Sequence, residues 1–453
     1  MRKILSVISI SVLVALLSVV LGFKSIVFFV GVLIVLAYLY YSFKYTSKAF
    51  WFTYFVVLSL PIGNNNILEY ITIRIKGIGI NIIPICIGII FCIVCIKHKE
   101  YKNNFIKNNL NKWFIILYLI YFISILNGIL NGNERIIEDF VMYAYQAFLF
   151  YCTFKLVKNS DDIYKIMNIT MLAQIVNCIL TIIMYFTHDL SIWGIQYNGG
   201  RFGGNYLTLI ILTVSYALFL IYNRKNKINI GILIAFLILS VSVMFISQNR
   251  TNPLLLLLSS GIMFFITLFN KKSTRNLFQK LIMIIVILIF FVGFITTALK
   301  SNNEFVQRFT NITSISEDKN MKTRINTFKY YSDLIIKNPM GSGFGTLMPF
   351  IDSSGRVKYE NSLNVDNTYL NIGRKVGVIG LILYILIILS PIKGLTKIYL
   401  NNRDMIYLSI MIAYCMLLIA ASMVTSQSIH SYSVSSFIWV FISYVNIKLT
   451  ETK

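Results

Sequence analysis

The chain has 453 residues, of which 57% are hydrophobic and 13% are charged, whereas a typical soluble domain has about 25% charged residues. So low a charged fraction excludes an ordinary soluble globular protein, because the chain could not cover its own surface with polar groups. The net charge of +24 does not indicate a nucleic-acid partner, since the basic residues lie in short clusters between apolar runs, where they report membrane topology.

The apolar runs predict an all-α, polytopic membrane helix bundle. They are continuous rather than alternating, and backbone in lipid must satisfy its hydrogen bonds within helices or closed barrels. A spanning helix needs about 20 mostly apolar residues, a rule that gives about 12–14 transmembrane helices here. The third and the last runs are short for a full crossing, so the number stays open. The predicted spans are 4–22, 25–43, 50–62, 78–96, 113–130, 140–157, 163–187, 205–222, 228–247, 254–270, 281–299, 368–390, 406–424 and 434–447.

The distribution of Lys and Arg predicts the orientation, because positive residues concentrate in cytoplasmic loops. With the N-terminus inside and the helices alternating, the short inner segments hold many more of the 41 Lys and Arg residues than the short outer segments. Both termini are therefore expected in the cytoplasm. The same alternation divides the chain into a transmembrane bundle (1–299), a large extracytoplasmic loop (300–367) and C-terminal transmembrane helices (368–453).

The large loop is expected to have its own structure. Residues 322–337 predict an amphipathic helix, because four apolar residues recur at helical spacing. Asn338 and Pro339 end this helix, and the glycines of Gly341–Gly345 turn the chain. The four apolar residues are Ile325, Phe328, Tyr331 and Ile335.

Two arginines are expected on the outer face between apolar runs. Arg250 lies in Ser247–Pro253, a segment too short for a free loop, so it is expected near headgroup depth. It is either an interfacial anchor whose side chain snorkels or an anion ligand, since Arg offers a fixed fork for phosphate. Arg201 lies among the glycines of Asn198–Asn205, a pattern compatible with a structural turn or with an anion-binding nest.

Two further charges lie within the large loop. Arg324 opens the predicted loop helix, where a lone arginine is usually solvated. Asp366 precedes the apolar run that re-enters the membrane. It is either the N-cap of the next helix or a base or polar handle that faces the same compartment as the three arginines.

Three segments, in order and at matching spacing, resemble the O-antigen ligase/polymerase superfamily. The first is Ser247–Leu258, which resembles that superfamily's Ser-x-x-Arg entry into a leucine-rich helix. The second runs from Arg324 to Gly345 and resembles its large-loop signature. The third, Asp366–Leu370 followed by Gly377–Gly380, resembles its loop exit. The resemblance covers about 247–390; the first half of the chain matches only as a bundle of helices.

The resemblance implies a glycosyltransferase that acts on glycans carried by a polyprenyl pyrophosphate. Ligases of the superfamily have His-Asn at the loop exit, and that His is the proposed base. Here Asp366 takes its place, as is common in polymerases of the Wzy type, so the resemblance favours a repeat-unit polymerase of O-antigen or capsule synthesis. Two alternatives stay open: a ligase that moves glycan onto lipid A core, and a flippase or transporter that makes no bond.

The resemblance also implies roles for particular residues. Arg250 and Arg324 would clamp the pyrophosphate of the donor, and Asp366 would orient or deprotonate the acceptor hydroxyl; these three are the candidate catalytic residues. No metal or nucleotide cofactor is expected, because the pyrophosphate lipid is already an activated leaving group. The candidate substrate-binding residues are Arg201, Asn367, Tyr369, Gly341 and Gly343.

The implied partners follow from the same resemblance. They are an undecaprenyl-pyrophosphate-linked oligosaccharide and the lipid bilayer, with a chain-length regulator and a flippase beside them. The implied location is the bacterial cytoplasmic membrane.

Overall fold

A computed structural model describes residues 36–59, 72–75, 78–97, 109–157, 162–187, 196–198, 201–203, 207–223, 228–247, 251–269, 285, 319–358, 362–425 and 427–451. Its helices are α3 (Thr46–Ser59), α5 (Ile82–Lys97), α7 (Asn109–Leu130), α8 (Ile136–Leu156), α9 (Asp162–Thr187), α10 (Leu207–Asn223), α11 (Ile230–Ile246), α12 (Thr251–Phe269), α15 (Lys319–Lys337), α16 (Thr368–Asn402), α17 (Met405–Leu418), the π-helix η3 (Ile419–Val424), α18 (Gln427–His430) and α19 (Tyr432–Glu451).

The predicted helical membrane bundle is confirmed. Among the described residues, four helices are long and apolar enough to cross a membrane, and four shorter apolar helices accompany them. The predicted spans 4–22 and 281–299, apart from residue 285, and most of 25–43 lie outside the described residues. The four long helices are Asn109–Leu130, Asp162–Ile183, Thr368–Asn402 and Met405–Met423.

Three short antiparallel hairpins interrupt the helices, and the sequence did not predict them. In the first, β1 (Thr72–Ile75) pairs with β2 (Ile78–Asn81), so strand replaces helix at the start of the predicted span 78–96. The others join β3 (Gln196–Asn198) to β4 (Arg201–Gly203) and β5 (Phe350–Ile351) to β6 (Val357–Lys358). Such short strands carry too little periodicity to be distinguished from loop or helix ends.

Helix α19 lies at the centre of the bundle, where it contacts α3, α8 and α16. Most of its side chains, including Trp439, are fully buried. A helix that is buried on all sides needs no polar face, and its serines allow close approach and bond to neighbouring helices. Ser443, for example, donates to the carbonyl of Phe150 on α8 at 2.8 Å.

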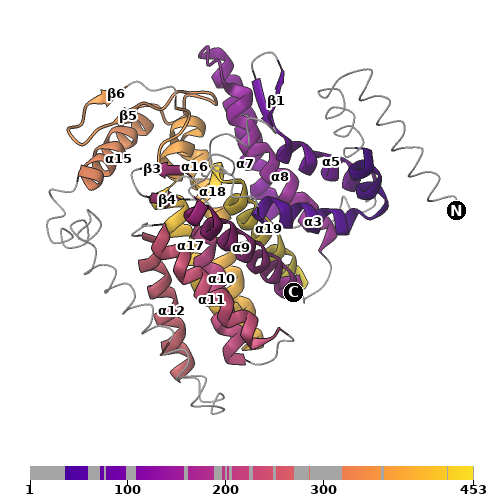
Figure 1. The fold of residues 1–453 in the computed structure, drawn as a ribbon. Helices are drawn as coiled ribbons and strands as arrows, with labels where there is room; N and C mark the ends of the chain where they lie inside the picture. The colour runs from indigo at the N-terminus through magenta and orange to yellow at the C-terminus, as the bar shows by residue number, and fades with distance from the viewer. Residues whose placement is uncertain are drawn as a thin grey trace, which may run out of the picture.

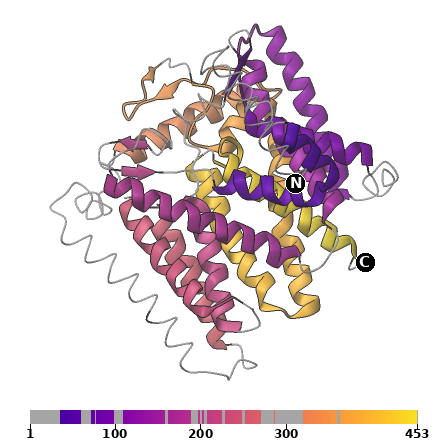
Figure 2. The same ribbon diagram turned by 45° about the vertical axis from the view of Figure 1, so that its right-hand side comes forward.

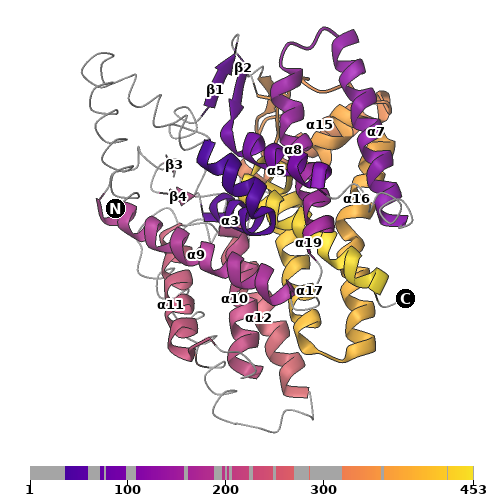
Figure 3. The same ribbon diagram turned by 90° about the vertical axis from the view of Figure 1, so that its right-hand side faces the viewer.

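The bundle has two distinct ends. Helix α15 and the three hairpins lie towards one end, whereas α10, α11, α12, α16 and α17 extend towards the other (Figures 1, 2 and 3). Helix α16 starts at the α15 end, is kinked at Gly377 (φ 88°, ψ 179°) and continues to Asn402. It is longer than the predicted span 368–390, so Lys393 and Lys397, which we expected in a connecting loop, lie on the helix itself.

The loop helix is also confirmed, since α15 spans Lys319–Lys337 where 322–337 was predicted. Of the four apolar residues predicted to form its buried face, two are buried and two are exposed. Tyr331 and Ile335 are buried, in a small core with Met348, Ile351 and Leu370. Ile325 and Phe328 are exposed instead, because this core extends only along the second half of the helix.

Candidate active site

A pocket of ≈ 190 Å³ opens between α15, the β5–β6 hairpin and the segment that leads into α16. We call it the loop pocket. Three residues that the sequence singled out line it together: Arg324, Asp366 and Asn367. Arg324 lies on α15 inside the large loop and Asp366 and Asn367 lie at its end, so the fold, rather than sequence proximity, brings them into one place.

The loop pocket offers one exposed cation and one exposed anion. Arg324 and Asp366 are both exposed, and within the described part of the chain they form no ion pair with each other. The remaining walls combine hydroxyl and amide groups with exposed apolar side chains such as Phe328 and Phe350. Such a pocket suits a ligand that has an anionic group, several hydroxyls and an apolar part.

The backbone around Asp366 is held firmly although its carboxylate is exposed. Asn371, one turn into α16, accepts from the amide of Val365 at 2.9 Å and donates to its carbonyl at 2.8 Å. Asn367 is the N-cap of α16, and its side chain accepts from the amides of Tyr369 and Leu370 at 2.9 and 3.1 Å. The capping role considered for Asp366 therefore belongs to its neighbour Asn367, and the Asp366 carboxylate is left facing solvent at a fixed position.

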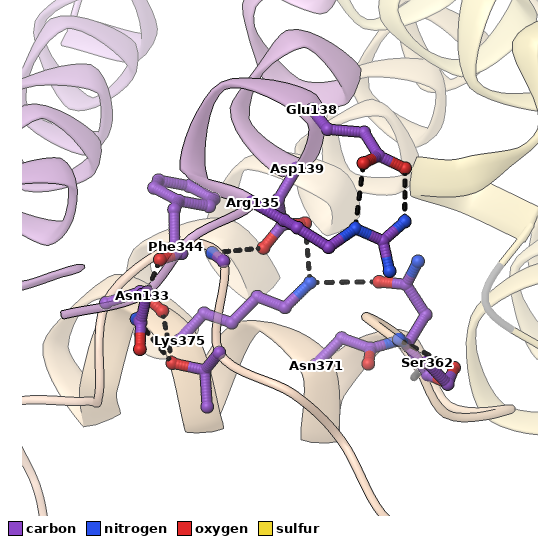
Figure 4. A network of polar contacts seen from close by, with 12 residues as sticks. Asn133, Arg135, Glu138, Asp139, Phe344, Ser362, Asn371 and Lys375 are labelled. Atoms are coloured by element: carbon purple, nitrogen blue, oxygen red, sulfur yellow. Dashed lines mark hydrogen bonds and ion pairs between the residues drawn. The ribbon is translucent and has the colours of Figure 1, made fainter. Parts of the chain in front are cut away.

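A buried ion pair anchors the same segment to the bundle. The Nζ of Lys375 lies 2.7 Å from Oδ1 of Asp139 on α8, and the two side chains are 0% and 1% exposed. Lys375 also donates to Oδ1 of Asn364 at 2.9 Å, and Asn364 lines the loop pocket. Figure 4 shows the Lys375 ammonium group beside the Asp139 carboxylate. A buried charge needs such partners because burial without them is very costly.

The Gly341–Gly345 segment is inserted between α7, α8 and the start of α16. The amides of Ser342 and Gly343 donate to the carbonyls of Arg374 and Lys375 at 2.8 and 2.9 Å. The amide of Gly345 donates to Oδ2 of Asp139 at 2.9 Å. The backbone polar groups of the loop are thus paired with those of the helices, as burial requires.

The glycines are explained by this close packing. Gly341, Gly343 and Gly345 all have positive φ, a conformation that glycine adopts at no steric cost. A Cβ on Gly343 would lie 2.1 Å from the amide nitrogen of Gly128 on α7, and one on Gly341 would lie 2.6 Å from the carbonyl oxygen of Lys375. Neither Gly341 nor Gly343 lines the loop pocket, so the structure gives both a packing role, and contact with substrate stays a prediction.

The other wall of the loop pocket is also anchored. The hydroxyl of Tyr331 on α15 donates to the carbonyl of Pro349 at 2.7 Å, and burial raises its pKa, so it stays protonated as a donor. Asn326 donates to the carbonyls of Asp352 and Ser353 in the β5–β6 hairpin at 3.3 and 3.2 Å. Helix α15 is therefore fixed to the hairpin and to the residue before it by two side chains, both of which follow Arg324 along the helix.

The π-helix η3 completes the pocket. Its Met423 lines the pocket and its carbonyl accepts from Nδ2 of Asn367 at 3.2 Å. π-helical turns within α-helices are rare and often lie at functional sites. Helix α12, which begins at Thr251, contacts η3.

Three predicted residues lie elsewhere or outside the described structure. The amide of Tyr369 is held by the Asn367 cap, and its side chain does not line the loop pocket. Arg201 pairs with Asn198 in the β3–β4 hairpin, at the end of the bundle that carries α15 (Figure 1). Arg250 lies outside the described residues and directly precedes α12. Whether Arg250 and Arg324 converge stays a prediction.

The sequence analysis missed Asp139 and Lys375. A signal existed for Lys375, since it lies within the predicted span 368–390, and a charge inside a span marks a candidate functional position. Nothing local in the sequence identified Asp139 as its partner. No group of three or more His, Cys, Asp or Glu side chains that could hold a metal ion occurs in the described ranges.

Comparison with known proteins identifies one related family. Residues 235–385 match the family model described as O-antigen ligase. The resemblance to the O-antigen ligase/polymerase superfamily is confirmed over this segment. It includes Arg324, Asp366, Asn367 and Lys375, but neither Asp139 nor Met423. No curated protein and no solved structure matches the chain.

Proposed function

We propose that this protein is a polysaccharide polymerase that transfers a growing glycan from polyprenyl pyrophosphate to the next lipid-linked repeat unit. The single observation that supports it most is the gathering of Arg324, Asp366 and Asn367 around one pocket at the end of a membrane bundle. Apart from Met423, the residues that line the pocket lie within the matched segment 235–385, and the pocket's mixture of charge, amide groups and exposed aromatic rings suits a lipid-linked sugar.

Arg324 is assigned to the donor pyrophosphate. The bond between the anomeric carbon and the phosphate oxygen breaks, and the pyrophosphate lipid leaves with the electron pair. Its oxygens gain negative charge as it does so, and a guanidinium group offers two parallel charge-assisted hydrogen bonds to such a group. Stabilising charge that develops in the transition state is commonly the largest catalytic term. The expected second ligand is Arg250, since it directly precedes α12 and α12 contacts η3.

Asp366 is assigned to the acceptor. The hydroxyl of the incoming repeat unit attacks the anomeric carbon, a new carbon–oxygen bond forms, and the hydroxyl proton moves to the Asp366 carboxylate and then to water. A base must lie within hydrogen-bond reach of that proton, which the fixed backbone around Asp366 favours. The pyrophosphate lipid is an activated donor, so this scheme calls for no nucleotide or metal.

The second candidate is a ligase, favoured by the description of the matched family. The bond broken is the same, and only the acceptor differs: lipid A core in place of a lipid-linked repeat. The presence of Asp366 at the loop exit favours the polymerase, because the resemblance places His at this position in ligases. A flippase would leave the chain length of the glycan unchanged.

The test is product length. Purified protein in lipid vesicles is incubated with lipid-linked repeat units, and chain growth is measured by gel electrophoresis, with lipid A core as a second acceptor in parallel. Wild-type protein is expected to lengthen the repeats, and Arg324→Ala to lose activity by about 10²–10³-fold, the loss seen when one donor to a developing anion is removed. Arg324→Lys should lose most of the activity too, because Lys lacks the bidentate fork.

Two matched variants serve as controls. Arg356 is an exposed arginine of the same loop that does not line the pocket, so Arg356→Ala should polymerise at the wild-type rate. Asp333→Asn, on the exposed face of α15, is the control for Asp366→Asn. Wild-type chain growth by Arg324→Ala would refute the clamp, and full activity of Asp366→Asn would refute the base. Transfer to lipid A core alone would identify a ligase.

A further inference from the structure

A second, larger cavity lies at the other end of α16. It is a groove of ≈ 630 Å³ between the first turns of α7, the second half of α16 and the last turns of α19. We call it the lysine groove. Figure 3 shows the C-terminal end of α19 and one end of α7 beside α16, below α15 in that view. It shares no residue with the loop pocket.

Close packing of two helices forms the floor of the groove. A Cβ on Gly394 of α16 would lie 2.4 Å from Cγ1 of Val445 and 3.0 Å from Cδ1 of Leu449. Glycine therefore lets α19 approach the backbone of α16, as small residues do between membrane helices. The floor is also fixed by the hydrogen bond from Asn446 to Asn111 of α7, at 2.7 Å in the interior.

The rim of the groove carries two positive charges. Lys393 and Lys397 are four residues apart, which places them on one face of α16. Both are exposed and both line the groove. No Asp or Glu lines it, and within the described part of the chain neither lysine forms an ion pair. Among the described residues, no acidic side chain therefore offers a counter-charge to the two ammonium groups.

The walls below the lysines are apolar and open. Leu386 and Leu389 are 45% and 42% exposed, and Trp113 at the mouth is 41% exposed. In a bilayer such side chains contact acyl chains, whereas Trp and Lys near helix ends lie at headgroup level. A groove with cations at its rim and a long apolar wall matches a molecule that has an anionic head and a hydrocarbon tail.

We propose that the lysine groove binds one anionic phospholipid. Its phosphate lies between Lys393 and Lys397 at the level of Trp113, and one acyl chain follows Leu386 and Leu389. Basic pockets between membrane helices are known to recognise anionic headgroups. A soluble anion would leave the apolar wall unfilled, and a zwitterionic lipid would leave the two lysines without a net counter-charge.

The test uses full-length protein in detergent, titrated with phosphatidylglycerol or with phosphatidylcholine of the same acyl chains. Retained lipid is counted by native mass spectrometry, and the unfolding temperature is measured in parallel. Wild-type protein is expected to retain one phosphatidylglycerol in preference to phosphatidylcholine and to unfold at a higher temperature with it. Lys393→Gln/Lys397→Gln should weaken the binding of phosphatidylglycerol by about tenfold or more, because the variant lacks both charges that attract the anionic head.

The control is Lys329→Gln/Lys337→Gln, which removes two exposed lysines of α15 that lie outside both cavities and should leave retention unchanged. If the glutamine variant does not fold, Lys393→Arg/Lys397→Arg keeps the charge and should keep the preference. Equal retention of the two lipids by wild-type protein would overturn the proposal. So would displacement of phosphatidylglycerol by inorganic phosphate, which would indicate an anion site, or by equimolar polyprenyl pyrophosphate, which would assign the groove to the substrate lipid.

Discussion

Two parts of the large loop lie close together but are held in opposite ways. The Gly341–Gly345 segment is inserted among helices, its amides bond to their carbonyls and to Asp139, and no side chain larger than hydrogen fits at Gly343. The loop pocket presents Arg324 and Asp366 to solvent. The anchored backbone therefore fixes where the two charged groups lie, and in the described part of the chain neither forms an ion pair. This arrangement is what a preorganised site requires.

The largest effect is expected from breaking the anchor itself. Asp139→Asn leaves the Lys375 ammonium buried without its counter-charge, and removing one partner of a buried pair costs about 3–5 kcal/mol. We expect a correspondingly large fall in stability, measured as the unfolding temperature of the purified protein in detergent, together with loss of chain growth.

The exposed pair Arg135–Glu138 in the same region provides the control. Nε of Arg135 donates to Oε2 of Glu138 at 2.8 Å, and these side chains are 38% and 42% exposed. Glu138→Gln should cost about 1 kcal/mol or less, because surface pairs contribute little. Equal losses from the two variants would show that the buried pair does not anchor the loop. The double variant Asp139→Leu/Lys375→Met should recover part of the stability, since apolar residues often replace a buried pair without loss, whereas the amide of Gly345 and the side chain of Asn364 still lose a partner.

A smaller effect is expected from the glycines, where two positions separate backbone strain from crowding. Gly343 and Gly355 have nearly the same φ, 85° and 83°, so alanine at either position costs about 1–2 kcal/mol for the left-handed backbone. Only at Gly343 does the added Cβ also meet backbone atoms, those of α7; at Gly355 the nearest atom is 3.8 Å away. Gly343→Ala should therefore unfold at a lower temperature than Gly355→Ala and lose activity. Equal unfolding temperatures would mean that the Gly341–Gly345 segment is not tightly packed against α7.

These positions show which parts of the molecule a single sequence can predict. The helix at 322–337 was predictable because its signal is local: apolar spacing, then Asn338 and Pro339 as terminators. The turn at Gly341–Gly345 was predictable as well, but not its depth of burial, which depends on Gly128 of α7. The pair of Asp139 and Lys375 joins residues far apart in the chain, and no local pattern connects them.

The difference between local sequence signals and long-range contacts also explains the errors at the candidate site. Apolar spacing predicted one continuous buried face for α15. The small core beside α15 buries only Tyr331 and Ile335 of this face, and Phe328 lines the loop pocket instead. Asp366 and Asn367 are both residue types that favour the N-cap position. The N-cap of α16 is Asn367, whose backbone is extended at φ −161° and ψ 119°. Sequence reasoning found the charged groups of the loop pocket but not the contacts that hold them.

The smallest effect is expected from the cap that adjoins Asp366. Asn367→Ala removes the acceptor for two amides of α16 and the donor to Met423, and loss of an N-cap costs about 0.5–2 kcal/mol. Asp404 caps α17 in the same way, accepting from the amide of Ile406 at 3.2 Å, and it lies far from the pocket along the chain. Asp404→Ala should therefore lower the unfolding temperature by a similar amount and leave chain growth unchanged. Asn367→Ala should also slow chain growth, because Asp366 is no longer held in position between its anchors. If the two variants lose stability and activity to the same extent, the Asn367 cap only stabilises the start of α16. The activity of the loop pocket would then not depend on the fixed backbone beside it.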